Sequence, residues 1–252
     1  MKILNKMATI SIEEAYKRFD NDERFLFEKI KDPEMMVHYV LSFRGVNSVY
    51  FLYNFFIEKE FQKSKNYLYK IGMVNAYYHE VLKMGIFGMI NIFTFPILSD
   101  SSKLINRYLT YHKTGTYDHY DWFTTHFAKG IQSILNDDMN TLETHIDGLR
   151  RRSKRGDAKL FTGMITAFEG FYNKDKEQIK TGIYEVLKKT KRQYPNSLDY
   201  QYIHYEATAI AKLAWRKGME IEIDSPLVPK ELLPVRELEH YEGYEFFKEL
   251  EK

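Results

Sequence analysis

The sequence predicts an all-α protein in which antiparallel helical hairpins stack into a TPR-like α/α repeat array, closed by an extended cap at its C-terminal end. Apolar residues recur at helical spacing along most of the chain, as at Met164 and Phe168. The turn at 173–175 is so short that the helices on either side of it must fold back on each other. A shift of 37 residues aligns Asn136 with Asn173 and also aligns the apolar positions that follow them. A period of this length is typical of helical hairpins that stack into a solenoid.

Length and composition indicate one domain with a large core. With 252 residues, of which 44% are apolar and 16% aromatic, the chain can bury a core rich in Phe and Tyr. We expect a single all-helical domain over 1–252, with an N-terminal helical layer over 1–112 and the hairpin repeats and cap over 117–252. The polar stretch 113–116 between them is too short to act as a free linker.

Charge and cysteine content narrow the possible functions. Lys and Arg number 37 and Asp and Glu 35, and the net charge of +2 gives no overall field for nucleic acid or a membrane surface. The absence of cysteine excludes disulfides, thiol nucleophiles and Cys-based metal sites, and it fits a reducing compartment. The N-terminus lacks the long apolar core of a secretory signal. We therefore expect a cytoplasmic protein.

The most apolar run of the chain is 84–98. It is too short for a typical membrane span and contains Asn91 and Pro96. We predict a buried helix followed by an exit loop here, and we expect no membrane partner.

The first helices have recognisable starts. Ser11 and Glu14 match a capping box, which predicts a helix over 12–30. Pro33 suits the first position of a second helix, which is expected to end near Gly45. Two further helices are predicted after it, over 48–61 and 63–83. The helix over 48–61 is apolar nearly all round, so we expect it to be buried.

The C-terminal half is predicted to close after an incomplete repeat. A third helix over 197–217 has no partner helix, and Gly218 is well placed to end it. Residues 219–223 alternate between apolar and acidic, as in an extended segment packed on one side. A last short helix is expected near 230–233, with nearby prolines fixing the approach to it.

This closing region has a distinctive residue order: Ala209-x-Ala211-x-Leu213-Ala214, then Gly218, Ile223-Asp224-Ser225-Pro226 and Pro229-x-Glu231-Leu232-Leu233. It resembles the C-terminal end of the immunity protein 49 family, over about a tenth of the chain. The resemblance implies an all-helical protein of a bacterial polymorphic toxin system, which binds and neutralises a cognate toxin domain without catalysis. It supplies no catalytic motif, and we interpret the shared residues as a structural closure and not as toxin contacts.

The sequence contains no pattern typical of an active site. His119 and His126 are seven positions apart, whereas a helical metal pair needs His at i and i+4 or Glu-x-x-His. His79 is followed by Lys83 where a zincin has its second His. The chain also lacks a Gly-x-Ser-x-Gly elbow, a P-loop and a dinucleotide fingerprint. We expect no enzyme activity, no metal and no cofactor.

Two charged stretches supply the candidate partner-binding residues. In the basic stretch 150–155 these are Arg151 and Arg152, although cations also suit a solvated helix C-terminus. No aromatic residues are interleaved there for base stacking, so nucleic acid is not expected as a partner. In the acidic stretch 236–252 the candidates are Glu239, Glu242 and Glu245. Charge complementarity would speed association there, although the sequence favours the simpler explanation that they form the polar outer face of a terminal helix.

The first functional hypothesis is an immunity protein that binds one toxin domain stoichiometrically. The alternative is a helical-repeat scaffold or adaptor that binds a peptide or protein partner, and a third is an enzyme with an unrecognised helical site. Tight binding of one toxin domain without turnover would favour the first. Binding of short peptides from many partners would favour the second, and a stoichiometric bound metal the third.

Overall fold

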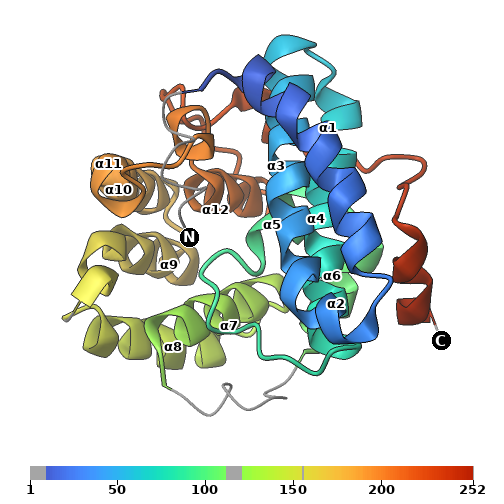
Figure 1. The fold of residues 1–252 in the computed structure, drawn as a ribbon. Helices are drawn as coiled ribbons and strands as arrows, with labels where there is room; N and C mark the ends of the chain where they lie inside the picture. Colours follow the sequence, from blue (N-terminus) through green and yellow to red (C-terminus); the bar gives the residue numbers. More distant parts are fainter. Residues whose placement is uncertain (1–9, 112–120, 155, 252) are drawn as a thin grey trace.

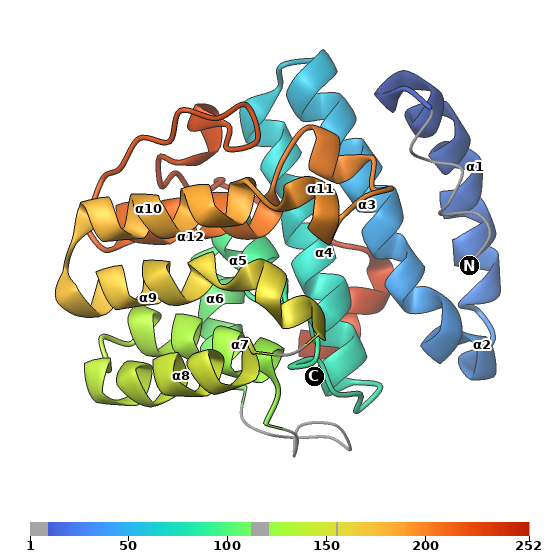
Figure 2. The ribbon, with the colours of Figure 1, turned by 90° about the vertical axis from the view of Figure 1, so that its left-hand side faces the viewer.

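The computed structural model describes residues 10–111, 121–154 and 156–251, and within these ranges the chain forms helices joined by turns, with no strand. The prediction of an all-α fold is confirmed. The helices form two groups (Figure 1). Figure 2 shows α1, α3 and α4 running steeply along one side, while α7, α8, α9 and α10 lie across them in layers.

The N-terminal group is α1 (Ile12–Lys29), α2 (Pro33–Tyr39), α3 (Phe43–Leu52) and α4 (Phe61–Glu80). The predicted capping box starts α1. Ser11 Oγ accepts a hydrogen bond from the Glu14 backbone N–H at 3.2 Å, and the Glu14 carboxylate accepts one from Ser11 N–H at 3.3 Å. Asp32 caps α2, and Pro33 occupies its first turn as predicted.

Two predicted boundaries in this group are wrong. Helix α3 runs through Gly45, and the chain instead breaks at the 3₁₀ turn Val40–Ser42. A glycine inside a helix costs only about 1 kcal/mol, which the burial of α3 offsets. The helix predicted over 48–61 also ends early, since it passes into the π-helical turn Tyr53–Ile57 before Lys59 turns the chain at a φ of 59°.

The helix predicted within 84–98 is mostly absent. Residues 84–93 form turns, and α5 covers only Thr94–Ser99. Phe87 and Phe93 are nonetheless buried as expected. Pro96 lies in the first turn of α5, where its missing N–H leaves no intrahelical hydrogen bond unmade.

The second group begins after α6 (Ser102–Leu109) and consists of α7 (Phe123–Leu135), α8 (Met139–Arg152), α9 (Gly163–Asn173), α10 (Lys176–Leu187), the short α11 (Thr190–Gln193) and α12 (Tyr205–Arg216). Each long helix of this group packs on the next: α7 on α8, α8 on α9, α9 on α10, and α10 on α12. Glycine allows α9 and α10 to approach closely. A Cβ atom at Gly182 would lie 2.4 Å from the backbone N of Ala167 and 2.4 Å from the carbonyl O of Gly163.

The helix predicted over 197–217 begins later than expected, at Tyr205. The preceding chain forms the 3₁₀ turn Asp199–Gln201, and the Asp199 carboxylate accepts a hydrogen bond from Ser48 of α3 at 2.5 Å. The predicted end at Gly218 is confirmed. Gly218 has a φ of 72° and donates to Trp215 O, and Met219 N–H donates to Ala214 O at 2.8 Å, the two bonds of a Schellman motif.

The segment after α12 is extended, with Ile221 and Ile223 buried and the intervening Glu222 exposed, as the alternation predicts. The last short helix is the 3₁₀ turn Lys230–Leu232. The division predicted at 113–116 lies outside the described residues.

Candidate functional site

Residues 234–251 follow the 3₁₀ turn Lys230–Leu232 and form a tail that returns to the N-terminal group of helices. The tail lies at the far edge of the molecule from α8 and α10 (Figure 1) and ends in the 3₁₀ helix Glu245–Glu251, which packs on α4. Its backbone is held by side chains of the helices: Asn66 Oδ1 accepts from Glu242 N–H at 2.9 Å, and Arg107 donates to Leu250 O at 3.0 Å. The tail is therefore a fixed part of the surface.

A buried ion cluster fixes the start of the tail. We call it the Asp100 cluster: Asp100, Lys65, Lys212 and Arg216. The carboxylate of Asp100 lies 2.7 Å from the ammonium group of Lys65, 2.7 Å from that of Lys212 and 2.6 Å from the guanidinium of Arg216. The side chains of Asp100, Lys65 and Lys212 are almost fully buried. Burial lowers the pKa of Lys212 to about 8, although Asp100 opposes that shift.

Backbone carbonyls of the tail and of Leu232 just before it accept further hydrogen bonds from the lysines of this cluster. Lys65 Nζ donates to Arg236 O at 2.9 Å, and Lys212 Nζ donates to Leu232 O at 2.5 Å and to Pro234 O at 3.2 Å. The two ammonium groups therefore have partners other than the single carboxylate, as buried cations require. The arrangement joins α4, α12 and the tail.

Tyr244 anchors the middle of the tail. Its ring packs against those of Phe27 and Phe43, and its hydroxyl donates to Glu23 Oε1 at 2.6 Å and accepts from Asn47 Nδ2 at 2.8 Å. Burial and the nearby Glu23 carboxylate raise the pKa of Tyr244 well above its ordinary value.

Between the tail and α4 lies a groove of about 520 Å³, which we call the tail groove. It is lined by Tyr69, Met73, His240, Tyr241, Glu242, Gly243, Tyr244, Glu245, Phe247, Lys248 and Glu251. Two of the predicted partner-binding residues, Glu242 and Glu245, are therefore part of its wall. Both are exposed, as is the third, Glu239.

The tail carries a strong excess of negative charge. Over 236–251 it contains six glutamates against one arginine and one lysine. The lysine, Lys248, is paired with Glu245 at 2.6 Å, so it does not neutralise Glu239 or Glu242. Within the described residues, no salt bridge involves the side chain of Glu239 or Glu242.

The predicted basic candidates lie elsewhere, at the C-terminal end of α8. Arg151 and Arg152 are both exposed, and Arg152 pairs with Asp121 at 2.5 Å. Hydrogen bonds from Arg152 and His126 lower the pKa of Asp121 to about 2. Arg150 is engaged with Asp147 and Glu169, and Arg155 lies outside the described residues. In Figure 1, α8 and the tail are on opposite sides of the molecule, so the two sets of candidates do not form one surface.

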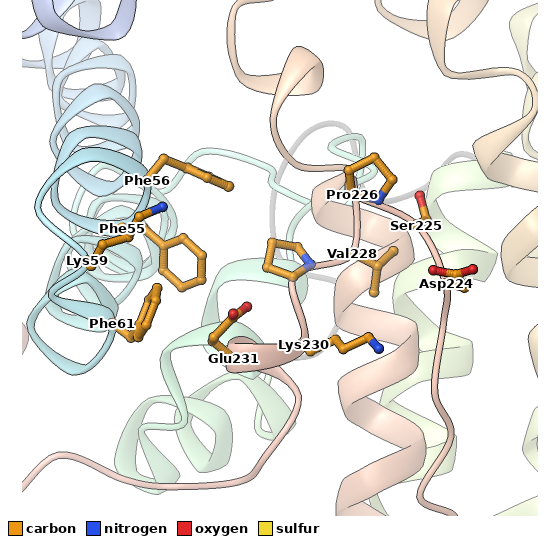
Figure 3. Close-up of a pocket in the computed structure, with 11 residues that line it drawn as sticks. Phe55, Phe56, Lys59, Phe61, Asp224, Ser225, Pro226, Val228, Lys230 and Glu231 are labelled. Carbon is orange, nitrogen blue, oxygen red and sulfur yellow. The ribbon is translucent and has the colours of Figure 1, made fainter.

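A second groove, of about 330 Å³, separates the end of α3 from the extended segment (Figure 3). Phe55, Phe56 and Phe61 line one side, and Pro226 and Val228 the other. Cations and anions are mixed around it, since Lys59 and Lys230 accompany Asp224 and Glu231. The charges around this groove therefore select neither a positively nor a negatively charged partner.

His204 and its neighbour Glu206 are buried together at the start of α12. His204 caps α12 by accepting from Ala207 N–H. Its neighbour Glu206 is fully buried and accepts hydrogen bonds from Tyr194 at 3.0 Å and Tyr200 at 2.8 Å. Burial acts to raise the pKa of Glu206, but His204 and Tyr200 outweigh it, and the net shift is downward. This carboxylate is a core anion whose charge is satisfied by hydrogen bonds.

One of the two histidines considered as a metal pair in the sequence lies within the described residues. His126 lies 3.1 Å from His145 and contacts Asp121, but His119 lies outside the described residues. Within the described ranges, no group of three or more His, Cys, Asp or Glu side chains is arranged to hold a metal ion. Every helix in these ranges is also too short or too polar to cross a membrane.

Comparison with known families adds one match. A family model described as "Immunity protein 49" matches residues 93–232, more than half of the chain. The match runs from the residue before α5 to the end of the 3₁₀ turn Lys230–Leu232, and it includes the residues on which the resemblance rests except the last, Leu233. Comparisons with curated proteins and with solved structures gave no match.

Proposed function

The chain belongs to the immunity protein 49 family, and we propose that it binds and neutralises a cognate bacterial toxin by stoichiometric protein–protein contact, without catalysis. The family match is the observation that carries this proposal. Inhibition by binding needs a rigid, complementary surface and no reactive group. The anchored tail and the packed helices α7 to α10 are surfaces of that kind.

For the toxin contact we propose the acidic residues Glu239, Glu242 and Glu245. All three are exposed. Asn66 of α4 binds the backbone N–H of Glu242, and Glu245 begins the 3₁₀ helix that packs on α4, so little conformational entropy is lost when these two residues bind a partner. Arg151 and Arg152 remain a proposed second contact on α8. Because they lie on another side of the molecule, a small toxin domain would meet only one of the two sets.

The proposal extends to the architecture and the cellular context. We propose that the hairpins α7–α8 and α9–α10 and the helix α12 form a TPR-like repeat array, with 219–233 as its cap. The successive packing of these helices supports this interpretation. We further propose that residues 1–252 form one domain, which acts in the bacterial cytoplasm within a polymorphic toxin system and has neither nucleic acid nor membrane as a partner.

Co-expression tests the function in cells. A toxin domain encoded beside the gene for this chain should stop growth when produced alone and should be tolerated when the chain is produced with it. The two proteins should then co-purify as one complex. Growth arrest that persists despite abundant folded chain would contradict the proposal, and co-purification of many unrelated peptides would favour a general scaffold.

A further inference from the structure

The two grooves of the molecule differ in their relation to the family match. All eleven residues that line it lie outside 93–232, either on α4 or on the tail. The second groove, by contrast, takes Asp224 to Glu231 from inside the matched range. A family model describes what members share, whereas recognition of one particular partner depends on the side chains of an individual protein. The tail groove therefore lies entirely in the part of the chain that the family model does not match.

The lining of the groove determines which partner side chains it can accept. Tyr69, Met73 and Phe247 provide an apolar and aromatic floor, and Glu242, Glu245 and Glu251 provide the acidic walls. Glu245 pairs with Lys248 and Glu251 with Lys103, both on the exposed surface, whereas Glu242 makes no salt bridge within the described residues. Basic groups at its edge are already engaged: Lys248 pairs with Glu245, and Lys70 Nζ lies 4.9 Å from the centre of the Tyr244 ring. A long cationic side chain could place its aliphatic part on the floor and its charge among the carboxylates.

The size of the groove suits a short segment of a protein partner. About 520 Å³ is within the range of ~300–1,000 Å³ found for ligand sites, so it can take more than one side chain. Arg and aromatic residues are the most frequent energetic anchors of protein interfaces, and this groove pairs an aromatic floor with carboxylates that could bind an Arg fork.

We propose that the tail groove is the specificity-determining contact of this chain and receives a Lys- or Arg-bearing segment of the cognate toxin domain. This inference rests on the proposed function and deepens it. The shared helices 93–232 then serve as the scaffold, and the Asp100 cluster holds the tail against that scaffold in the position that forms the groove.

A pair of matched charge reversals tests the inference. Glu242→Lys with Glu245→Lys changes the groove, and Glu143→Lys with Glu222→Lys makes the same change in net charge on exposed positions inside the matched range. Each full-length variant is titrated against the catalytically inactive toxin domain encoded beside this gene, by calorimetry at two salt concentrations. We expect the groove variant to bind at least about 100-fold more weakly and the control variant within about 2-fold of the wild type.

Cross-linking identifies the occupant. A carbodiimide reagent joins carboxylates to nearby amines, and in the wild-type complex it should link Glu242 or Glu245 to a toxin lysine. A toxin that uses arginine there would instead show hydrogen-exchange protection of 240–251. Equal affinity of both variants, with neither cross-link nor protection, would overturn the inference while leaving the proposed function intact. Absence of any binding by the wild-type chain would instead overturn the proposed function.

Discussion

Lys212 Nζ lies 2.7 Å from Asp100 Oδ2, although the two residues are 112 positions apart in the chain. The same carboxylate oxygen accepts a hydrogen bond from Lys65 Nζ at 2.7 Å and from the backbone N–H of Arg236 at 3.1 Å. One carboxylate thus connects α4, α12 and the start of the tail. The position of the tail, and of the groove it forms, depends on this buried contact.

Asp100→Asn should be strongly destabilising, because it leaves buried cations without their counter-charge. We expect a loss of about 3–5 kcal/mol in the free energy of unfolding, measured by urea denaturation. Asparagine tolerates the left-handed backbone of this position, where φ is 67°, so the change isolates the charge. The matched control is Asp20→Asn, which breaks an exposed pair with Arg24 and should cost under about 1 kcal/mol. Equal effects of the two changes would contradict the importance of the cluster.

Gly182→Ala should also destabilise the chain, because the added methyl group meets backbone atoms of α9 at 2.4 Å that cannot move aside. We expect a loss of about 1–3 kcal/mol. Gly45→Ala, at a position inside helix α3, serves as the comparison. The nearest side-chain atom to its added methyl group would belong to Phe19, at an ordinary contact distance of 3.8 Å. That change should raise the stability by about 0.5–1 kcal/mol. Thermal unfolding of both variants would show opposite shifts, and a shift of the same sign would contradict this packing.

Tyr244→Phe should weaken the attachment of the tail without leaving a cavity where the ring packs. The variant keeps the ring contacts but loses the hydroxyl that bonds Glu23 and Asn47, at a cost of about 1–3 kcal/mol. Hydrogen exchange of the backbone amides over 241–251 should become faster while α7 to α10 keep their protection. Tyr172→Phe, at a position that is 40% exposed, is the control and should change neither quantity. Uniformly faster exchange across the whole chain would argue against a local role.

Alkaline pH should destabilise the fold through two phenols that hold the tail. Burial raises the pKa of Tyr77 and Tyr241 from 10 to about 12. Between pH 10 and 12 the two phenols stay protonated in the folded chain but lose their protons in the unfolded chain. The contribution of these phenols to the free energy of unfolding is therefore complete below pH 10 and is lost as the pH rises through 12. Tyr77→Phe with Tyr241→Phe should therefore make the free energy of unfolding fall less steeply between pH 10 and 12. Parallel pH profiles of the variant and the wild type would refute the assignment.

Local signals in the sequence predicted local structure well. Ser11 and Glu14 are close in the chain, so their pattern alone was sufficient to place the start of α1. Gly218 likewise marks the end of α12, because few residues other than glycine adopt its positive φ. The segment 84–93 could not be predicted in this way. Ile86, Phe87, Ile92 and Phe93 of this segment are buried, but turns place them in the core instead of a helix.

The site required information from distant parts of the chain. Lys212 sits between Ala211 and Leu213 in an apolar stretch of α12, and this placement is a signal that a buried cation needs a partner. Nothing near it in sequence identifies that partner as Asp100. The acidic tail residues were predicted as candidates from composition, but the groove beside them is formed only when the tail packs on Tyr69 and Met73 of α4.

The most direct test of the central proposal is a titration of toxin activity with the purified chain, at a toxin concentration well above the dissociation constant. Stoichiometric neutralisation predicts that residual activity falls linearly and reaches zero at about one molar equivalent, independent of incubation time. Activity that is lost progressively at far less than one equivalent would indicate turnover and contradict the proposal. Activity that persists at several equivalents of folded chain would contradict it equally.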